Sequence, residues 1–232
     1  MPADLIRAQP LASLPVVETF HSLQGEGLHA GRSAFFVRLA GCHVGCPWCD
    51  TKHSWPEGMH PRRPLAELAE LARAAAEAGA AFVVVTGGEP LQHELGALCA
   101  ALQEGTRTAA RPQGLPLHLE TSGVDPLSGS FAWITLSPKR HRPPRPALLA
   151  ACHELKVVVH EAEDLAFAEA MAAEACAARG GARGEARNGD EPALLLQPGW
   201  EAADGQALAV AFVQRNPRWR LSLQSHKWLG VR

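Results

Sequence analysis

Three cysteines stand close together in the first quarter of the chain. Cys42, Cys46 and Cys49 occur in the run GCHVGCPWCDT with the spacing C-x3-C-x2-C. One compact loop can place three such thiolates around an iron-sulfur cluster, for which thiolates are preferred ligands. A cubic cluster has four irons, so three cysteines leave one iron able to bind a substrate or a cofactor. The spacing therefore favours an enzyme that carries a 4Fe-4S cluster.

The same thiols could instead bind zinc. A structural zinc ion takes four ligands, usually arranged as two separated pairs, and His43 or His53 could supply the fourth here. Spacing alone thus leaves a noncatalytic zinc-binding or interaction module open. The other cysteines are scattered through Ala- and Leu-rich segments, and we expect them to be buried, inert thiols: Cys99, Cys152 and Cys176.

Two further candidates belong to apolar stretches that read as strands. In TGGEP, Gly87 and Gly88 would let a ligand approach the backbone, and Glu89 would bring a carboxylate to that point. A plain strand-to-helix turn is the alternative, but the place of this run, one strand and one helix after the cysteine loop, favours a ligand contact. Arg38 interrupts the apolar stretch 33–41. A charge is rarely buried without a partner, so we expect a functional role for it.

The elements that must position these residues alternate along the chain. Short apolar runs rich in β-formers predict strands, and helical spacing of apolar residues predicts helices between them. The predicted strands are 33–41, 81–85, 115–121, 131–137, 153–160, 194–198 and 219–224, and the predicted helices are 64–80, 91–104, 161–178 and 203–216. This alternation indicates an α/β fold with parallel strands joined by right-handed crossovers. Each candidate motif follows a strand, so all should meet at one end of a partial barrel or open sheet.

Composition narrows the class of protein. Of 232 residues, 47% are hydrophobic and 20% are charged, as in an ordinary globular protein. With 22 basic and 24 acidic residues the net charge is −2, which predicts neither nucleic acid nor a membrane surface as a partner. No leader-like segment or long apolar run is visible in the sequence. We expect a cytoplasmic protein that acts on a small molecule.

Domain organisation is predicted to be simple. We find no internal repeat and expect one domain spanning residues 1–232. Pro- and Gly-rich polar stretches predict exposed loops near 105–114, 141–147 and 178–193. None of them is long enough to link independently folded domains.

The cysteine triplet and Gly87-Gly88-Glu89 together resemble the radical S-adenosylmethionine superfamily, in which C-x3-C-x2-C is followed by a Gly-Gly-Glu strand end. The resemblance implies a partial (β/α) barrel of about six parallel strands. It also implies a 4Fe-4S cluster whose open iron is chelated by S-adenosyl-L-methionine. One-electron reduction would then release a 5'-deoxyadenosyl radical.

A closer resemblance, over residues 18–232, is to the 7-carboxy-7-deazaguanine synthase family. The segments that carry it are ETFHSLQGEG, FVRLAGC, CDTKHS, HLETSG, LSPK and SLQSHKWLGVR. The family converts 6-carboxy-5,6,7,8-tetrahydropterin to 7-carboxy-7-deazaguanine, with hydrogen abstraction, ring contraction and loss of ammonia. S-adenosylmethionine is regenerated, and the product feeds queuosine and related deazapurines. The resemblance thus implies a magnesium-dependent carbon-nitrogen lyase.

The resemblance also implies roles for individual residues. Beyond the three cluster cysteines, Thr51 would supply a hydroxyl to Mg2+, whose shell favours hard oxygen ligands and water. The pterin site would include Leu23, Gln24, Gly25, Glu26, Arg38, Thr86, Glu120, Gln214, His226 and Arg232. The S-adenosylmethionine site would include Trp48, Gly88, Glu89, Ser122, Ser137, Pro138, Lys139, Gln197 and Pro198. Arg38 would hold the pterin carboxylate with its guanidinium fork, and the terminal carboxylate of Arg232 would reach the substrate.

Simpler interpretations stand beside several of these roles. Gln24 and Glu26 lie in a run with turn chemistry, and Asp50 and Thr51 are preferred helix-capping residues, a role we assign to Asp50. His226 could be a surface histidine. Two features depart from the family pattern: the bulky terminal Arg232 and the additional loop at 105–114.

Partners follow from the same resemblance. It implies a flavodoxin or ferredoxin as electron donor and a homodimer as the assembly. The alternative enzyme is a radical S-adenosylmethionine activase that acts on a partner polypeptide. Such an activase needs a docking surface for a protein chain, whereas the polar strand ends of this sequence suit a small polar ligand.

Overall fold

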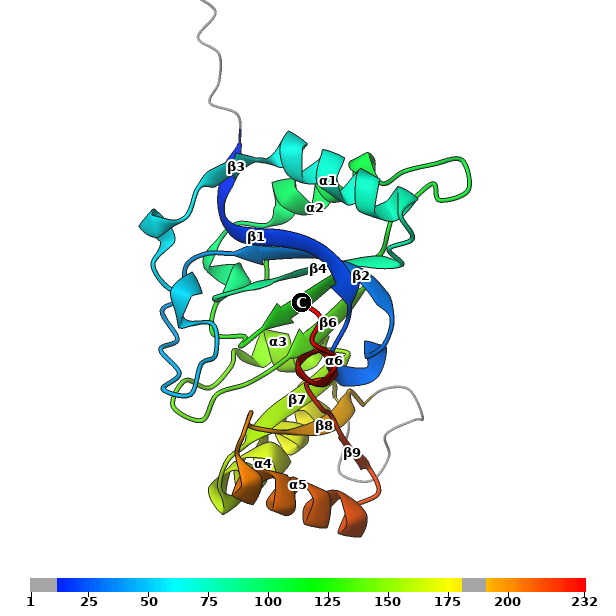
Figure 1. The fold of residues 1–232 in the computed structure, drawn as a ribbon. Coiled ribbons are helices and arrows are strands. Elements are labelled where there is room, and N and C mark those ends of the chain that lie inside the picture. Colours follow the sequence, from blue (N-terminus) through cyan, green and yellow to red (C-terminus); the bar gives the residue numbers. More distant parts are fainter. Residues whose placement is uncertain (1–11, 181–190) are drawn as a thin grey trace, which may run out of the picture.

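The computed structural model describes residues 12–180 and 191–232, which form one nine-stranded sheet (Figure 1). Its order is β3-β1-β2-β4-β5-β6-β7-β8-β9. From β2 onward all neighbours are parallel: β2 (Ser33–Leu39), β4 (Phe82–Gly87), β5 (Leu117–Thr121), β6 (Trp133–Leu136), β7 (Glu154–Val159), β8 (Ala193–Pro198) and β9 (Trp219–Leu221). Because each parallel strand lies beside the previous one, the connections progress in one direction, as in a (β/α) barrel left open.

Helices cover the outer side of this sheet. They are α1 (Leu65–Glu77), α2 (Gly96–Gly105), α3 (Pro146–Ala151), α4 (Ala162–Ala178) and α5 (Ala203–Arg215). In Figure 1, α1 and α2 lie at one end of the fan of strands and α4 and α5 at the other. The short helix α6 (Ser225–Leu229) instead lies with the C-terminus in front of the middle strands. The inner side is therefore left for a site.

Alternation along the strands separates two apolar clusters. In β4, Val83 and Val85 belong to the large core shared with the outer helices, whereas Phe82 and Val84 belong to a small cluster with Ala34 and Phe36. Thr86 continues the second set and reaches the inner face at the strand's carboxyl end. A strand that is apolar on both faces thus ends in a polar side chain where the inner face opens.

The antiparallel strand β1 (Ser13–Leu23) extends the sheet beyond β2 and was not predicted. Its burial is mostly intermediate, so it lacks the apolar run that marks the parallel strands. Phe20 stacks on Phe36 of β2 with ring centroids 4.8 Å apart, and β3 (Arg62–Pro64) pairs with its first residues. The loop after β1, with a 3-10 turn at Gly27–His29, then crosses the inner face and touches β7 through Leu28.

The predicted α/β fold with parallel strands is confirmed, with differences in detail. Seven strands of the described sheet are parallel neighbours, whereas about six were predicted. The helix expected at 91–104 begins only at Gly96, because a 3-10 turn at Pro90–Gln92 precedes it. The tail expected to be a strand to 224 ends as β9 at Leu221.

The loops predicted as exposed differ in outcome. Residues 107–113 lie at the surface, and residues 141–143 are exposed as well. The stretch 141–147 was expected to be extended, but α3 begins inside it at Pro146, which suits the first turn of a helix because it needs no donor there. Most of the loop expected at 178–193 lies outside the described residues. None of the helices in the described stretches is long and apolar enough to cross a membrane.

Candidate active site

The three clustered cysteines are free thiols that line one cavity of about 870 Å³. They follow β2 in a loop whose backbone is held by neighbours: Cys42 N donates to the carbonyl of Trp55, and His141 Nε2 lies 3.1 Å from the carbonyl of Val44. Within residues 12–180 and 191–232, no group of three or more His, Cys, Asp or Glu side chains is placed to hold a single metal ion. In a 4Fe-4S cluster each cysteine binds a different iron, and three thiolates from one loop suit that arrangement.

The Gly-Gly-Glu run closes against the cysteine loop. A Cβ on Gly88 would lie 2.3 Å from the carbonyl oxygen of Gly41, and one on Gly87, whose φ is +147°, would lie 2.2 Å from that of Leu39. Glu89 N donates to the Gly41 carbonyl at 2.8 Å. The two glycines therefore allow the ends of β2 and β4 to approach each other closely. The sequence had suggested a simple turn or a ligand contact and did not predict this packing.

Glu89 is 1% exposed and is held by the end of β5. Its carboxylate accepts from Thr121 Oγ1 at 2.5 Å, from Ser122 N at 2.8 Å and from Ser122 Oγ at 2.5 Å. It also accepts from Leu91 N and so caps the 3-10 turn that follows. A carboxylate with four donors is fixed in place, and rotation of the Ser122 hydroxyl would free one lone pair toward the cavity.

A second carboxylate stands on the inner face at the end of β5. Glu120 accepts from Gln24 Nε2 at 2.9 Å and from Thr86 Oγ1 at 2.9 Å. Gln24 Oε1 in turn accepts from the backbone of Glu26 at 3.1 Å. Gln24 is thus a buried link between the β1–β2 loop and the strand ends, which goes beyond the turn chemistry of its sequence.

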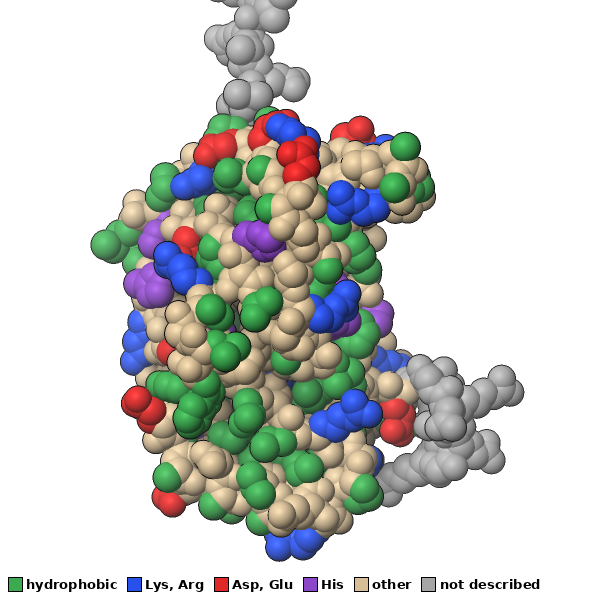
Figure 2. Space-filling model, turned by 45° about the vertical axis from the view of Figure 1, so that its right-hand side comes forward, with side chains coloured by type: hydrophobic (Ala, Val, Ile, Leu, Met, Phe, Trp, Pro, Cys, Tyr) green, Lys and Arg blue, Asp and Glu red, His purple; other side chains and the backbone are tan. Residues whose placement is uncertain are grey.

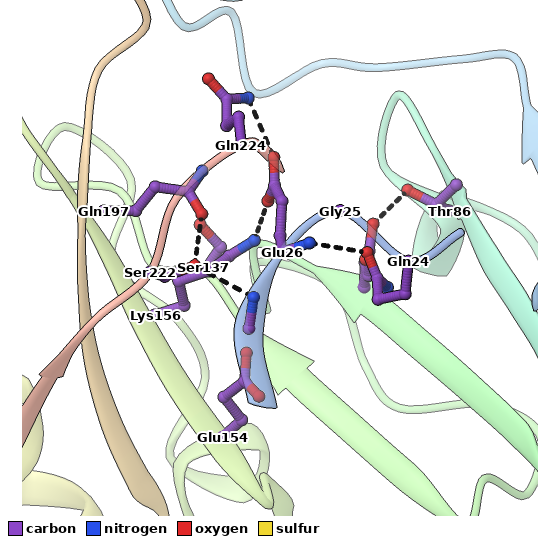
Figure 3. A network of polar contacts seen from close by, with 12 residues as sticks. Gln24, Gly25, Glu26, Thr86, Ser137, Glu154, Lys156, Gln197, Ser222 and Gln224 are labelled. Atoms are coloured by element: carbon purple, nitrogen blue, oxygen red, sulfur yellow. Dashed lines mark hydrogen bonds and ion pairs between the residues drawn. The ribbon is translucent and has the colours of Figure 1, made fainter. Parts of the chain in front are cut away.

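Glu26 lies in a buried ion pair that the sequence did not reveal. Its carboxylate pairs with Lys156 Nζ of β7 and accepts from Gln224 Nε2 at 2.9 Å (Figure 3). Burial alone would raise the pKa of Glu26, but the charge and hydrogen bond of Lys156 and the bond from Gln224 lower it to about 2. Burial opposes the charge on Lys156, yet Glu26 and Glu120 raise the pKa of this ammonium. Both groups are therefore ionised in the folded protein.

Arg38 reaches the cavity from β2 and is only partly engaged. Its Nε donates to Glu18 of β1 at 3.0 Å, and Glu18 also pairs with the guanidinium of Arg232. Within the described residues that ion pair uses only Nε of Arg38, so its two terminal amino groups stay available. The residue is thus oriented by one carboxylate, and its terminal amino groups could bind a second one.

The C-terminal segment covers the cavity from the other side. Ser225 N and Oγ both donate to the carbonyl of Gly25 at 2.9 Å, and a Cβ on Gly25 would lie 2.1 Å from His226 Nδ1. Lys227 Nζ donates to Asp50 at 2.5 Å and lies 4.8 Å from the ring centroid of Trp200. His226 is therefore packed against the β1–β2 loop instead of standing free at the surface, and burial lowers its pKa.

The predicted capping role of Asp50 is wrong. The short helix Lys52–Ser54 has Thr51 as its N-cap, without a side-chain hydrogen bond. Asp50 pairs instead with Lys227 of the tail. The Thr51 hydroxyl lies 3.5 Å from Cys49 Sγ, at the edge of the cavity.

Lys139 is a further basic residue of the cavity lining and forms no ion pair with any described residue. Its Nζ donates to Ser137 Oγ at 2.8 Å. Burial lowers its pKa, and Lys156 adds to that effect, while Cys46, Glu26 and Glu89 oppose it. Charges of the cysteine loop and of the Glu26–Lys156 pair therefore both act on Lys139.

The cavity lining includes every residue predicted from the sequence except two. The lining members are Leu23, Gln24, Gly25, Glu26, Arg38, Cys42, Cys46, Trp48, Cys49, Thr51, Thr86, Gly88, Glu89, Glu120, Ser122, Ser137, Lys139, Gln197, Pro198, His226 and Arg232. Gln214 does not lie there, because it is on the exposed face of α5, which packs on the outside of β8 and β9. Pro138 is buried beside the site but is not part of its lining.

Three functional neighbours were missed. Gln224 occupies the position that we had expected for Gln214, and it belongs to the quoted run SLQSHKW, so that segment held the signal. Ser222 accepts from Gly27 N at 3.0 Å and donates to Gln197 at 2.9 Å. Lys156, inside the run HELKVVVH, was the polar interruption of an apolar strand, the same signal that had marked Arg38.

Comparisons with known proteins point to one family. A family model described as Radical SAM superfamily matches residues 37–130. The 7-carboxy-7-deazaguanine synthase of Prochlorococcus marinus is 53% identical over 221 residues, covering 94% of this chain and 98% of that protein. The enzyme of the same name from Synechocystis sp. is 47% identical over 95% of this chain and 94% of that protein. The crystal structure of QueE from Escherichia coli superposes with a TM-score of 0.71 at 28% identity, covering 92% of this chain and 95% of that one.

Proposed function

The chain belongs to the 7-carboxy-7-deazaguanine synthase family of the radical S-adenosylmethionine superfamily, and from this premise we propose how its cavity serves that reaction. In the family, 6-carboxy-5,6,7,8-tetrahydropterin becomes 7-carboxy-7-deazaguanine with ring contraction and loss of ammonia. The observation that carries the proposal is that three free thiols and the polar residues of the β1–β2 loop line the same cavity. A radical source and a pterin can therefore lie side by side.

The cofactor end is the part of the cavity near the cysteine loop. Cys42, Cys46 and Cys49 would hold a 4Fe-4S cluster, which together with S-adenosylmethionine supplies a hydrogen-abstracting radical. Glu89 after β4 would accept from polar groups of the cofactor and Ser122 after β5 would donate to them, as their mutual contact in the cavity lining supports. Cofactor contacts are further proposed for the lining residues Trp48, Gly88, Ser137, Lys139, Gln197 and Pro198, whereas buried Pro138 would only support the neighbouring backbone.

The substrate end is formed by Arg38 and the two carboxylates. The free amino groups of Arg38 would bind the pterin carboxylate through parallel charge-assisted hydrogen bonds. Glu120 and Glu26 would accept from the N–H groups of the pyrimidine ring, since each has lone pairs beyond those used by its own neighbours. Thr86 and Gln24 donate hydrogen bonds to Glu120 and hold it in place. Leu23, Gly25 and His226 would enclose the ring. The terminal carboxylate of Arg232, whose guanidinium pairs with Glu18, would reach the substrate.

We propose that the enzyme depends on magnesium and that the Thr51 hydroxyl binds the ion. This hydroxyl lies 3.5 Å from Cys49 Sγ, and the residue lines the cavity. Mg2+ retains several waters and accepts few protein oxygens, so one hydroxyl with substrate oxygens and water would suffice. The carboxylate of the pterin would then be bound by Arg38 and by the ion together.

Assembly and electron supply are also part of the proposal. We infer a homodimer, and exposed apolar side chains support it, among them Trp228 at 76% and Leu229 at 62% exposure. On the face drawn in Figure 2, apolar side chains gather in the lower part of the molecule with few charges among them. A flavodoxin or ferredoxin would deliver the electron, and a cytoplasmic location stays a prediction.

The test is product formation under anaerobic conditions. The reconstituted protein is incubated with the carboxytetrahydropterin, S-adenosylmethionine, Mg2+ and a reductant, and 7-carboxy-7-deazaguanine is identified by mass spectrometry. We expect turnover that Cys46→Ala abolishes and that Cys176→Ala, a thiol of α4 outside the cavity, retains. Intact cluster content without any deazapurine product would overturn the proposal.

A further inference from the structure

Lys156 is a buried cation in the middle of the sheet. It is 5% exposed and lies on β7 between Leu155 and Val157, which face the core shared with the outer helices. Alternation turns Lys156 to the inner face instead, where it lines the cavity. A buried ammonium persists only with a partner, and Glu26 of the β1–β2 loop is that partner.

The pair joins three segments that lie far apart in the sequence. One oxygen of Glu26 accepts from Lys156 of β7, and the other accepts from Gln224 of the C-terminal segment at 2.9 Å (Figure 3). The next loop residue, Gly27, donates to Ser222 Oγ at 3.0 Å. The loop is therefore fixed at two successive residues, and the direction of the Glu26 carboxylate is set from both sides.

Other charges face this pair from neighbouring elements. His226 of α6, Glu120 of β5 and Lys139 after β6 act on the pair through their charges, and Glu154 lies two residues away on β7. Glu120 already takes hydrogen bonds from Gln24 and Thr86. Lys156 is thus the cation that directly balances Glu26 in a site rich in carboxylates.

We propose that Lys156 is a positioning residue for substrate binding, which keeps Glu26 ionised and aims its remaining lone pairs at the N–H groups of the pterin. This inference rests on the proposed function for the identity of the ligand. A carboxyl group offers both oxygens purely as acceptors only when it is deprotonated, since the protonated acid carries an O–H donor on one of them. Without Lys156, burial would favour the protonated acid, and the loop would lose the tie to β7 that orients it.

The test measures ligand binding and does not depend on turnover. The probe is 6-carboxypterin, a stable oxidised analogue, titrated by its fluorescence into anaerobic reconstituted protein with S-adenosylmethionine between pH 6 and pH 8.5. For Lys156→Met we expect binding weakened about tenfold at pH 6, as for a lost charged hydrogen bond, and partly recovered at pH 8.5. Lys52→Met, an exposed lysine, is the matched control and should bind as the wild type does.

A double variant separates positioning from a plain structural role. In Glu26→Gln/Lys156→Met both charges are gone, so the double variant should show no pH dependence beyond that of Glu26→Gln, in which His226 has lost the same Glu26 charge that raises its pKa. The double variant should also bind no more weakly than Glu26→Gln alone, because Lys156 acts through Glu26. This comparison remains available if Lys156→Met by itself fails to fold.

Several results would contradict the inference. They are wild-type affinity in Lys156→Met, a pH dependence of the double variant beyond that of Glu26→Gln, wild-type affinity in Glu26→Gln, or a double variant clearly weaker than Glu26→Gln. A wild-type protein that binds no 6-carboxypterin would instead overturn the proposed function, and this inference with it.

Discussion

At the scale of single residues, the cavity is organised by carboxylates that are each held by partners of the chain. Glu89 takes its hydrogen bonds from the end of β5, Glu120 from Gln24 and Thr86, and Glu26 from Lys156 and Gln224. Fixing a carboxylate in advance removes the entropy cost of orienting it when the ligand arrives. The site is therefore largely formed before substrate binds.

The role of Arg38 can be tested by a substitution that keeps its positive charge and removes the planar guanidinium group. Arg38→Lys keeps a cation near Glu18 but removes the fork that faces the cavity. We expect the KM for the pterin to rise about tenfold or more, equivalent to about 1.5–3 kcal/mol for a lost charged hydrogen bond. Steady-state kinetics under anaerobic conditions measures this, with Arg73→Lys on the exposed side of α1 as the control. An unchanged KM would show that the carboxylate of the substrate binds elsewhere.

Thr51 gives a prediction about magnesium. Thr51→Ala should weaken the stimulation of turnover by Mg2+ while the iron content stays unchanged, and Thr51→Ser, which keeps the hydroxyl, should behave like the wild type. Activity titrated with MgCl2, together with iron analysis, checks both statements. Equal magnesium responses in all three proteins would remove Thr51 from the metal site.

At the scale of elements, the decisive contact is that between the ends of β2 and β4. Gly88 allows the strand end of β4 to touch the carbonyl of Gly41, directly before the first cluster cysteine. The cysteine loop is thus shaped by a neighbouring strand as much as by its own sequence. Any side chain at position 88 must displace either the end of β4 or the cysteine loop.

Gly88→Ala tests this contact. Its Cβ would lie 2.3 Å from the Gly41 oxygen and 2.8 Å from Cys42 Cβ, so we expect the loop to shift and the iron content of the reconstituted protein to fall strongly. Gly58→Ala, where nothing lies within 4 Å of the new atom, should keep the full cluster. Iron and sulfide analysis with circular dichroism distinguishes cluster loss from unfolding. Normal iron content in Gly88→Ala would show that the close approach is dispensable.

The strands and helices also show which parts of the fold can be predicted from the sequence. The parallel strands could be predicted because strands buried on both faces are continuous apolar runs, and the motifs at their ends fell into one cavity for the same reason. The strand β1 could not be predicted in this way, because its residues are mostly half buried and the strand it pairs with, β2, lies across a loop. Gln214 was assigned from the family resemblance, and only the packing of α5 shows that its side chain faces solvent. The ion pair of Lys156 joins residues 130 positions apart, a contact that local patterns do not encode.

At the scale of the whole molecule, the segments near the two ends of the described chain close the site together. The β1–β2 loop lies on the inner face, the C-terminal segment packs on it through Ser225 and Gly25, and Arg232 returns to Glu18 of β1. Beneath the cavity, at the starts of the strands, His118 stacks on Phe82 with centroids 4.1 Å apart, and His29 of the loop lies 4.6 Å from His118. This ring cluster supports the loop from below.

The ring cluster predicts a loss of stability in mild acid. Burial, with the charges of His29 and Arg32, lowers the pKa of His118 to about 3. The folded protein thus keeps this imidazole neutral, while the unfolded chain takes up a proton below its ordinary pKa. The stability is complete above about pH 6.5 and is lost as the pH falls from there toward 3, by up to about 2 kcal/mol at pH 5.

His118→Phe keeps the stacking on Phe82 and removes the titration. We expect its free energy of unfolding to fall less between pH 7 and pH 5 than that of the wild type, and His53→Gln, an exposed histidine, to follow the wild type. Urea unfolding at the two pH values provides the measurement. Parallel losses in wild type and His118→Phe would assign the acid sensitivity to other groups.

The most direct test of the account is a crystal structure grown anaerobically with S-adenosylmethionine, the carboxytetrahydropterin and Mg2+. The account predicts a 4Fe-4S cluster on Cys42, Cys46 and Cys49, with the pterin in the same cavity. The pterin carboxylate should lie at Arg38, and its ring N–H groups should lie against Glu26 and Glu120. Zinc on the three thiols, or a pterin bound outside this cavity, would contradict it.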